Sequence, residues 1–285
     1  MTDRRLGWLL LAPALVLLGG LTVYPALWVL WLSLQYRIPV FSISRWAGLE
    51  QYAFLAVDPR FWSAAWVTAV FAAGSVALEC GLGLAVALGL RGQARWRRAA
   101  LALLLLAWAL PSVVTAKMFE WLYHPAGGLV NFLLGGRTVN WLGDPALALP
   151  ALIAADVWRS TPFVALLCYA RLLTIPAELY EAAQVDGATG ARAFARITWP
   201  LVRPILLVAL LFRTLDALRA FDIMFVLTGG GPAGTTETLT VYAYRALFQM
   251  MQIGFGSAVG VVVFALVMLV AVAYLRLIDR ESGAA

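Results

Sequence analysis

Long apolar runs alternate with short polar segments along most of the chain. Six of these runs reach or exceed the ~20 residues that a helix needs to cross about 30 Å of hydrocarbon. Their approximate bounds are Leu6–Leu34, Trp62–Leu90, Ala99–Leu122, Leu147–Leu173, Leu201–Leu227 and Phe255–Ile278. Strict alternation of apolar and polar residues, the mark of a membrane β-strand, is missing from them. The pattern therefore predicts an all-α integral membrane protein with six transmembrane helices.

The first run follows Arg4 and Arg5, as the apolar core of a signal peptide would. It is longer than the roughly 7–15 residues of such a core, and it shows no cleavage site of small residues. We therefore expect this run to be retained as the first span.

Composition supports the membrane class and excludes two others. The chain has 285 residues, of which 63% are hydrophobic and 13% are charged. Soluble domains usually carry about 45–50% apolar and about 25% charged residues, so this chain has too few polar side chains to cover a globule. Its mean hydropathy of +0.86 also excludes a disordered chain, because disordered segments are poor in hydrophobic residues.

The arginines between the runs predict the orientation in the membrane. With the N-terminus inside, the inside segments hold eleven: Arg4, Arg5, Arg91, Arg95, Arg97, Arg98, Arg192, Arg196, Arg203, Arg276 and Arg280. The outside segments hold five: Arg37, Arg45, Arg60, Arg137 and Arg245. Because cytoplasmic loops carry the excess of positive charge, both termini are expected in the cytoplasm. The net charge of +6 then reflects orientation and does not indicate a nucleic-acid partner.

Two parts of the chain follow from this topology. Residues 1–61 would form the first span and an extracytoplasmic segment, whose stretch Gln35–Phe61 is rich in aromatics and fits an interfacial helix or cap. Residues 62–285 would form a core of five spans, interrupted by a cytoplasmic segment at about 175–200.

The segment at 175–200 differs from the other inside segments in its pattern. Thr174 is suited to be the N-cap of a short helix, with Pro176 in its first turn. Glu178 and Glu181 would then lie near the positive end of the helix dipole. The sequence thus predicts a helix in this segment, whereas it predicts only short charged loops for the other inside segments.

A second short helix is expected after a break at Asp186-Gly187, and Pro200 is expected to end it. One apolar face of the two helices would dock into a groove on a partner. That face holds Leu179, Ala182, Ala183 and Phe194. The alternative is an amphipathic loop that lies at the membrane interface.

This stretch resembles the EAA loop of ABC importer permeases, whose pattern is E-A-A, then D-G-A, then an apolar-x-L-P ending. The residues that match are Glu181, Ala182, Ala183, Asp186, Gly187, Ala188, Phe194, Ile197 and Pro200. The chain departs from the pattern at Trp199, where the family usually has leucine. The resemblance implies that these residues couple the protein to an ATPase subunit.

A second signature is similar to the carbohydrate branch of that family, the maltose/trehalose type. Leu227–Pro232 reads L-T-G-G-G-P and resembles its T-x-G-G-P turn, and Trp158, Pro162-Phe163 and Phe255–Ala258 also look like that branch. The resemblance covers essentially the whole chain. It implies the type I ABC importer permease fold and ATP-driven import of a sugar, a disaccharide such as trehalose or maltose, by alternating access.

The resemblance also implies partners and a location. These are a second homologous permease subunit, two ATPase subunits that carry ATP and Mg²⁺, an extracytoplasmic solute-binding protein, and the lipid of a bacterial or archaeal inner membrane.

The chain itself lacks the parts of an ATPase or a metal site. A P-loop needs glycines before its lysine, and the sole lysine, Lys117, has none there. One histidine, His124, and two cysteines inside apolar runs, Cys80 and Cys168, give no zinc or catalytic set. We expect no cofactor in this chain and no enzymatic activity.

Charged residues inside the runs form the second group of interest. They are Glu79, Lys117, Glu120, Asp156, Arg159, Arg213, Asp216, Arg219 and Asp222. At a helix centre each costs about 2.5–3.5 kcal/mol, so it must pair, face a cavity, or reach the headgroups. Glu120 and Arg213 are expected to reach the headgroups. The alternative is neutralisation within pairs three residues apart, which are Asp156/Arg159, Arg213/Asp216 and Arg219/Asp222.

The fifth run carries the predicted substrate path. Asp216, Arg219, Ala220 and Ile223 follow the i, i+3, i+4, i+7 spacing of one helix face. In the maltose-type permeases that this chain resembles, sugar contacts fall in this stretch, with asparagines at the positions of Arg219 and Ala220. The full prediction is Asp216, Arg219, Ala220, Asp222, Ile223 and Phe248. The alternative is a set of purely structural ion pairs.

Three other functions remain open at this stage. The first is an importer permease for a polyol, a glycerol phosphate or an oligosaccharide. The second is an intramembrane enzyme, which would need a nucleophile with a base or two apposed acids. The third is a structural membrane subunit without a translocation path.

Overall fold

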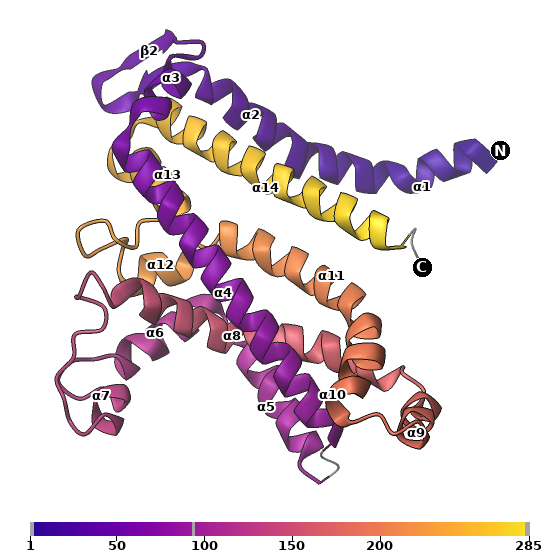
Figure 1. Cartoon of the computed structure of the whole chain (residues 1–285). Coiled ribbons are helices and arrows are strands. Elements are labelled where there is room, and N and C mark those ends of the chain that lie inside the picture. Colours follow the sequence, from indigo (N-terminus) through magenta and orange to yellow (C-terminus); the bar gives the residue numbers. More distant parts are fainter. Residues whose placement is uncertain (1–2, 93–94, 283–285) are drawn as a thin grey trace. The chain divides into compact units, whose positions relative to one another are not determined.

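Helices make up nearly all the regular structure of the computed structural model, which describes residues 3–92 and 95–282 (Figure 1). The prediction of an all-α protein is confirmed, with one addition. Within the described residues the only strands are β1 (Gln35–Ile38) and β2 (Ile43–Trp46). The ends of the two predicted parts, 1–2 and 283–285, and positions 93–94 of an inside loop lie outside the described residues.

The chain divides into two units. The first holds Met1–Trp62 and Tyr242–Ala265, and the second holds Ser63–Val241 and Leu266–Ala285. The first unit contains α1 (Asp3–Leu18), η1 (Gly19–Val23), α2 (Tyr24–Ser33), β1, η2 (Pro39–Phe41), β2, α3 (Glu50–Val57) and η4 (Arg245–Gln249). The second contains α5 (Arg97–Ala109), α6 (Ser112–Leu122), α7 (Leu129–Leu133), α8 (Ala148–Leu173), α9 (Ala177–Val185), α10 (Gly190–Ala193), η3 (Phe194–Thr198), α11 (Trp199–Leu218) and α12 (Asp222–Leu227). Three helices run from one unit into the other: α4 (Pro59–Gly92), α13 (Leu239–Tyr244) and α14 (Ile253–Ser282).

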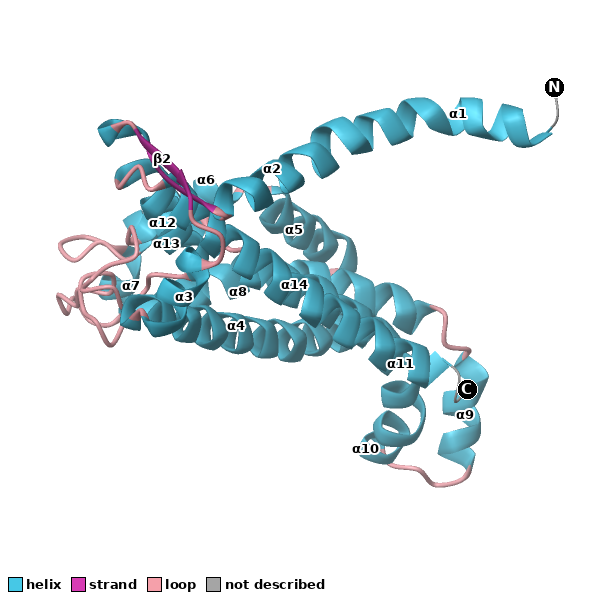
Figure 2. Ribbon diagram, turned by 90° about the horizontal axis from the view of Figure 1, so that it is seen from above, coloured by secondary structure: helices cyan, strands magenta, loops and turns pink. Residues whose placement is uncertain are grey.

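In the first unit, the stretch expected to be an interfacial helix or cap is an antiparallel hairpin followed by α3 (Figure 2, strands in magenta). Gln35 pairs with Trp46 and Ile38 with Ile43. The tyrosine hydroxyl of Tyr52 on α3 lies 2.7 Å from the hydroxyl of Ser33 at the end of α2. The hairpin and α3 thus form one cap on the end of α2.

The second unit is built on α8, which is buried along most of its length, with Leu152, Val164 and Cys168 fully buried. Helix α4 approaches it closely at Gly83. A Cβ atom built there would lie 2.6 Å from Cβ of Val164, so only glycine fits this crossing. Helix α11 packs on another side of α8, with Val202 and Ala209 fully buried. These three helices form the frame in which the polar side chains lie.

Four of the described helices are long and apolar enough to cross a membrane, and a fifth span results if α5 and α6 count as one broken span. The four are Leu10–Ser33, which runs through α1, η1 and α2, and Pro59–Gly92, Ala148–Leu173 and Ile253–Asp279. They match four of the six predicted runs. Helix α11 lies in the fifth predicted run, and it carries Arg203, Arg213 and Asp216, which lower its hydropathy.

The third and fifth predicted runs are not continuous helices. Helices α5 and α6 meet at a bend of 101°. Pro111 causes this bend, because proline disfavours the helical conformation of the residue before it, and Leu110 is extended with ψ 131°. In the fifth run, α11 ends at Leu218 and α12 begins only at Asp222.

The segment at 175–200 has its predicted break but not its predicted ends. Gly187 adopts φ +70° just after α9, as a left-handed glycine at a helix end does. Thr174 is not the N-cap of α9; its hydroxyl donates to the carbonyl of Arg171 at the end of α8. Pro200 does not end a helix either. It lies in the first turn of α11, where the missing amide would have no partner.

Figures 1 and 2 both show α9 and α10 at one end of the second unit, beyond the ends of α8 and α11. Helix α10 continues through the short π-helix η3 directly into α11. Because the backbone is continuous here, a displacement of this segment would act directly on α11.

Candidate functional site

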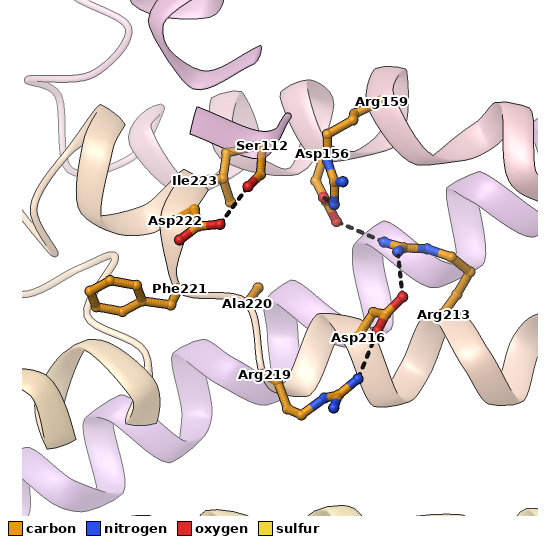
Figure 3. Close-up of a pocket in the computed structure, with 10 residues that line it drawn as sticks. All are labelled: Ser112, Asp156, Arg159, Arg213, Asp216, Arg219, Ala220, Phe221, Asp222 and Ile223. Atoms are coloured by element: carbon orange, nitrogen blue, oxygen red, sulfur yellow. Dashed lines mark hydrogen bonds and ion pairs between the residues drawn. The ribbon is translucent and has the colours of Figure 1, made fainter. Parts of the chain in front are cut away.

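A polar cavity of about 410 Å³ opens in the second unit, where α11 gives way to α12 (Figure 3). Ten residues from three segments line it: Ser112 from α6, Asp156 and Arg159 from α8, and Arg213, Asp216, Arg219, Ala220, Phe221, Asp222 and Ile223 from the end of α11 to the start of α12. Six of the ten are charged. Charged side chains inside a membrane-spanning bundle are costly, so these six must either pair with one another or face water or a solute.

The break between α11 and α12 forms one wall of this cavity. The amide of Arg219 donates to the carbonyl of Asp216 at 3.1 Å, which tightens the last turn of α11. The carbonyl of Ala220 then accepts a hydrogen bond of 2.7 Å from the hydroxyl of Thr240. This hydroxyl takes the place of a helical amide, so the chain leaves the axis of α11 after Leu218 and the break is held in place.

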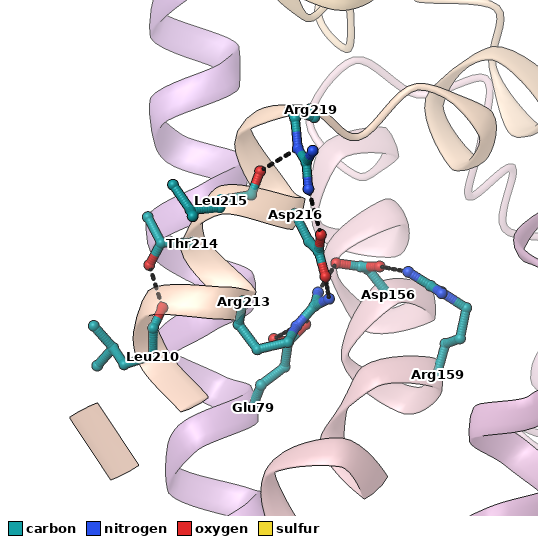
Figure 4. Close-up of polar contacts among 9 residues, drawn as sticks. All are labelled: Glu79, Asp156, Arg159, Leu210, Arg213, Thr214, Leu215, Asp216 and Arg219. Atoms are coloured by element: carbon teal, nitrogen blue, oxygen red, sulfur yellow. Dashed lines mark hydrogen bonds and ion pairs between the residues drawn. The ribbon is translucent and has the colours of Figure 1, made fainter. Parts of the chain in front are cut away.

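Arg213 stands at the floor of the cavity and joins three helices (Figure 4). Its Nε donates to Glu79 Oε2 of α4 at 2.6 Å, and its Nη2 donates to Glu79 Oε1 at 3.0 Å. The same Nη2 donates to Asp156 Oδ2 of α8 at 3.1 Å. The side chains of Arg213, Glu79 and Asp156 are 5%, 0% and 3% exposed. A buried charge needs a partner, and here one guanidinium satisfies two carboxylates at once.

The network becomes more exposed toward the mouth of the cavity. Asp216 accepts from Arg213 at 3.4 Å and from Arg219 at 2.9 Å, and the side chains of Asp216 and Arg219 are 54% and 60% exposed. Arg159 donates to Asp156 at 3.3 Å through Nη2. Its buried Nε has no hydrogen-bond partner among the described residues. The mouth thus presents the exposed Asp216 and Arg219 to a solute, whereas the unpaired Nε of Arg159 is buried behind them.

Asp222 lies on the opposite wall. It accepts a hydrogen bond from the hydroxyl of Ser112, the first residue of α6 (Figure 3). This bond connects the start of α12 to the start of α6. Each of the two helices begins at a break in a predicted span, so the cavity forms where both breaks meet.

Away from the cavity, helix α9 also carries predicted site residues, and it is largely exposed. None of its residues is buried, and the apolar side chains of Leu179 and Val185 are 44% and 88% exposed. Glu181 and Ala182 are also exposed. Of the other matching residues, Asp186, Gly187 and Ala188 form the turn after α9, Phe194 and Ile197 are half-buried in η3, and Pro200 is the second residue of α11.

Residues 81–282 match the family described as the inner membrane component of binding-protein-dependent transport systems. The chain belongs to this family. It is 39% identical to the trehalose/maltose transport system permease protein of Thermococcus litoralis, over 96% of this chain and 94% of that protein. It is 40% identical to the sulfoquinovosyl glycerol transport system permease protein of Agrobacterium fabrum, over 98% and 92%. The trehalose transport system permease protein of Mycobacterium tuberculosis is 35% identical, over 99% and 91%.

The fold is that of a type I ABC importer permease. The chain superposes with a TM-score of 0.84 on a crystal structure of a bacterial ABC transporter involved in the import of the acidic polysaccharide alginate, at 23% identity and with 98% and 97% of the two chains covered. The family model and the curated relatives confirm the resemblance to carbohydrate ABC importer permeases, and the chain is a multi-pass membrane permease.

The structure of the permease brings together five of the six residues predicted for the substrate path: Asp216, Arg219, Ala220, Asp222 and Ile223 all line the cavity. Phe248 does not line it. This residue belongs to η4 of the first unit, where its ring is 65% exposed and lies 5.1 Å from that of Tyr244. The role of these residues in transport stays a prediction.

Three predicted details of the charges are wrong. Arg219 and Asp222 do not pair, because the helix that would put them on one face ends between them; they pair with Asp216 and Ser112 instead. For the same reason Asp216, Arg219, Ala220 and Ile223 do not follow one helical face. Arg213 does not reach toward headgroups, because Glu79 and Asp156 hold its guanidinium inside the bundle.

Five lining residues are not in the predicted path: Ser112, Asp156, Arg159, Arg213 and Phe221. Asp156, Arg159 and Arg213 gave a signal as charges inside apolar runs, but no spacing rule connects α8 to α11. Ser112 gave a weaker signal: it directly follows Pro111, and a serine after a helix-breaking proline often starts the next helix.

The permease has a second and larger hollow, of about 1420 Å³, that is lined mainly by apolar side chains of α4, α5 and α8. Leu78, Leu103 and Ile153 are typical of its lining, which contains no charged residue. It offers almost no hydrogen-bonding groups to a hydroxyl-rich solute. The polar cavity is therefore the stronger candidate for a solute site.

Proposed function

We propose that the permease imports a neutral sugar, a disaccharide such as trehalose or maltose, and that the sugar binds in the polar cavity at the break between α11 and α12. The observation that carries this proposal is the set of exposed donors and acceptors at the mouth of that cavity. Carboxylates such as Asp216 accept hydrogen bonds from sugar hydroxyls, and the guanidinium of Arg219 donates to sugar oxygens. Phe221 offers an aromatic ring to an apolar sugar face. A volume of about 410 Å³ lies within the roughly 300–1,000 Å³ of small-molecule sites.

The balance of charge favours a neutral solute. The cavity is lined by three carboxylates, Asp156, Asp216 and Asp222, and by three guanidiniums, Arg159, Arg213 and Arg219. Their formal charges cancel, and Glu79 beneath them adds a negative charge that also faces Arg213. An anionic solute would need a cation that is not already matched, because complementary potentials decide which partner is accepted.

Transport would proceed by alternating access. The helices α4, α8 and α11 all contribute to the charged network, so a rotation of one against the others would change the exposure of the cavity to the two sides. A sugar that binds both states would then be released where its affinity is lower. The break between α11 and α12 lets one wall move without unfolding a continuous helix.

The partners follow from the family. A second homologous permease subunit would complete the pathway, two ATPase subunits would bind ATP and Mg²⁺ and dock against α9, and an extracytoplasmic binding protein would deliver the sugar. We place the complex in the inner membrane of a bacterial or archaeal cell, with lipid around the apolar faces and with no cofactor in this chain.

The test is uptake by the whole complex in proteoliposomes supplied with ATP, the binding protein, and labelled trehalose or maltose. We expect ATP-dependent uptake of at least one of the two sugars. Uptake of only a polyol, a glycerol phosphate or a longer oligosaccharide would reject the neutral disaccharide, and no solute-stimulated ATP hydrolysis at all would indicate a structural subunit.

The position of the site is tested by filling it. Ala220 is a half-buried lining residue, so Ala220→Phe would place a ring in the cavity and reduce uptake roughly ten-fold or more, since overpacking is not tolerated where a ligand must fit. Ala53→Phe on the exposed face of α3 is the matched control and should transport normally. Normal uptake by Ala220→Phe in a correctly assembled complex would place the sugar elsewhere.

One alternative has support of its own. The relative from Agrobacterium fabrum carries the name of a sulfoquinovosyl glycerol permease, and Arg159 and Arg219 are suited to hold a sulfonate. Two uptake measurements decide between them. If the cavity accepts neutral sugars, an excess of a sulfonated sugar should leave trehalose uptake unchanged; if the arginines select anions, a labelled sulfonated sugar should be imported and trehalose should not.

A further inference from the structure

Tyr180 fastens the exposed helix α9 to the rest of its unit. The other residues of this helix are mostly exposed, while Tyr180 is half-buried and packs against the hydrophobic core. The guanidinium carbon of Arg91 lies 4.0 Å from the centroid of its ring. Its hydroxyl lies 2.9 Å from Oγ1 of Thr198. One side chain thus makes two directed contacts, one through its face and one through its tip.

The two contacts lead to different helices. Arg91 belongs to the last turn of α4. Thr198 is the last residue of η3, is 4% exposed, and passes directly into α11. Farther along the same two helices, Glu79 of α4 pairs with Arg213 of α11 at 2.6 Å. Along a helix of 1.5 Å per residue, these partners lie about 18 Å from Arg91 and about 22 Å from Thr198.

We infer that Tyr180 is the positioning residue that transmits a displacement of α9 to α4 and α11, and through them to the polar cavity. The inference rests on the proposed function, in which an ATPase subunit moves α9. A single contact would let α9 pivot around it. Contacts at the ring face and at the hydroxyl fix both the position and the orientation of the ring, so α4, α9 and α11 move as one body at this end.

Single substitutions separate the two contacts. Tyr180→Phe and Thr198→Val each remove the hydroxyl contact and keep the ring. Arg91→Ala removes the cation over the ring, and Arg91→Lys keeps a cation there. Arg97→Ala, which removes an exposed arginine at the start of α5, is the control for the loss of one positive charge.

The measurement is made on the full complex in proteoliposomes with the binding protein and trehalose or maltose. We expect the number of ATP molecules hydrolysed per sugar imported to rise roughly two- to ten-fold in Tyr180→Phe and Thr198→Val, the range expected for the loss of one hydrogen bond. We expect a rise of about two- to five-fold in Arg91→Ala, less in Arg91→Lys, and none in Arg97→Ala. Subunit composition should be unchanged throughout. An unchanged ratio in Tyr180→Phe and Arg91→Ala would overturn the inference, and so would loss of the ATPase subunits from Tyr180→Phe, because the residue would then serve attachment instead.

A second measurement does not depend on the sugar. Spin labels on cysteines at Val185 of α9 and Leu82 of α4, both exposed, should give the same narrow distance distribution in the resting complex and in one trapped with ATP and vanadate. The distribution should broaden in Tyr180→Ala. A narrow distribution in that variant would overturn the inference even if transport is impaired. A wild-type complex that imports neither sugar but keeps the narrow distribution would reject the proposed sugar and leave the inference intact.

Discussion

Arg213 shows how this membrane protein accommodates ionised groups. Its guanidinium is shared between Glu79 and Asp156, both nearly fully buried, and it also reaches the exposed Asp216. The planar guanidinium presents several donors in fixed directions, which suits one cation to several carboxylates. Lysine, with a single ammonium, would not hold α4, α8 and α11 in the same way.

The buried and exposed arginines of the network should therefore differ in their contribution to stability. Arg213→Ala leaves Glu79 without its cation in a low-dielectric interior and Asp156 with Arg159 alone, and it should lower stability by about 3–5 kcal/mol. Arg219→Ala leaves only the exposed Asp216, which keeps Arg213, and should cost about 1 kcal/mol or less. The melting temperature and the yield of folded permease in detergent measure both.

The double variant Glu79→Met/Arg213→Met serves as the control for this comparison. It removes the buried pair together, while Asp156 keeps Arg159, so it should recover much of the stability lost in Arg213→Ala. Equal melting temperatures for Arg213→Ala and Arg219→Ala would contradict the role assigned to the buried cation.

At the scale of elements, the sequence predicted the helices well wherever an apolar run is long and uninterrupted. The runs at Trp62–Leu90, Leu147–Leu173 and Phe255–Ile278 correspond to α4, α8 and α14 within a few residues. The bend at Pro111 was readable in principle, because proline restricts the residue before it. The break after Leu218 was not, since residues 219–221 contain neither glycine nor proline, and a hydroxyl from Thr240, distant in sequence, stabilises it.

The same limit applies to the cavity. Charges within apolar runs predicted a cluster of polar groups inside the membrane, and five of the six residues predicted for the substrate path do line one cavity. Which charge faces which was not predictable, because Glu79, Asp156 and Arg213 come from three separate helices and their pairing depends on how those helices pack. Phe248 was predicted because an aromatic ring can pack on an apolar sugar face, and the fold puts it in the other unit.

An ion pair in the first unit predicts how the stability of the hairpin depends on pH. Arg45 of β2 donates two hydrogen bonds of 2.8 Å to the carboxylate of Glu50 at the start of α3. This contact lowers the pKa of Glu50 below its usual value, and it raises the pKa of Arg45, which stays charged. A group with a lowered pKa stabilises the fold above its unfolded pKa, and it loses that contribution as the pH falls through the folded value.

We therefore expect Glu50→Gln and Arg45→Gln to melt slightly below the wild type at pH 7, and all three to converge as the pH falls below about 4. The difference should be small, because both side chains are 52% exposed. Melting curves across pH measure it. A difference between wild type and variants that persists or grows at low pH would exclude this ion pair as its source.

At the scale of the whole molecule, both proposals require one arrangement in the membrane. An ATPase subunit reaches α9 only if that helix is cytoplasmic, and the six-span topology then puts the hairpin on the extracytoplasmic side, where the binding protein delivers the sugar. The charge bias of eleven arginines against five predicts this orientation. The same bias makes the positively charged end of α4, at Arg91, the cytoplasmic end, on the side where Tyr180 contacts it.

Cysteine labelling in sealed spheroplasts tests this orientation directly. Val40 next to the hairpin strands and Val185 on α9 are 64% and 88% exposed, so cysteines there would react freely. The native Cys80 and Cys168 are 8% and 0% exposed and should stay silent. A membrane-impermeant maleimide should label Val40→Cys in sealed spheroplasts, and it should label Val185→Cys only after the membrane is opened. Labelling of Val185→Cys from outside would place α9 on the wrong side of the membrane for any ATPase, and it would therefore reject the orientation, the coupling role of α9 and the transmission through Tyr180 together. Labelling of both sites only after opening would instead mean that the hairpin faces the cytoplasm, because an even number of crossings would then separate it from α9.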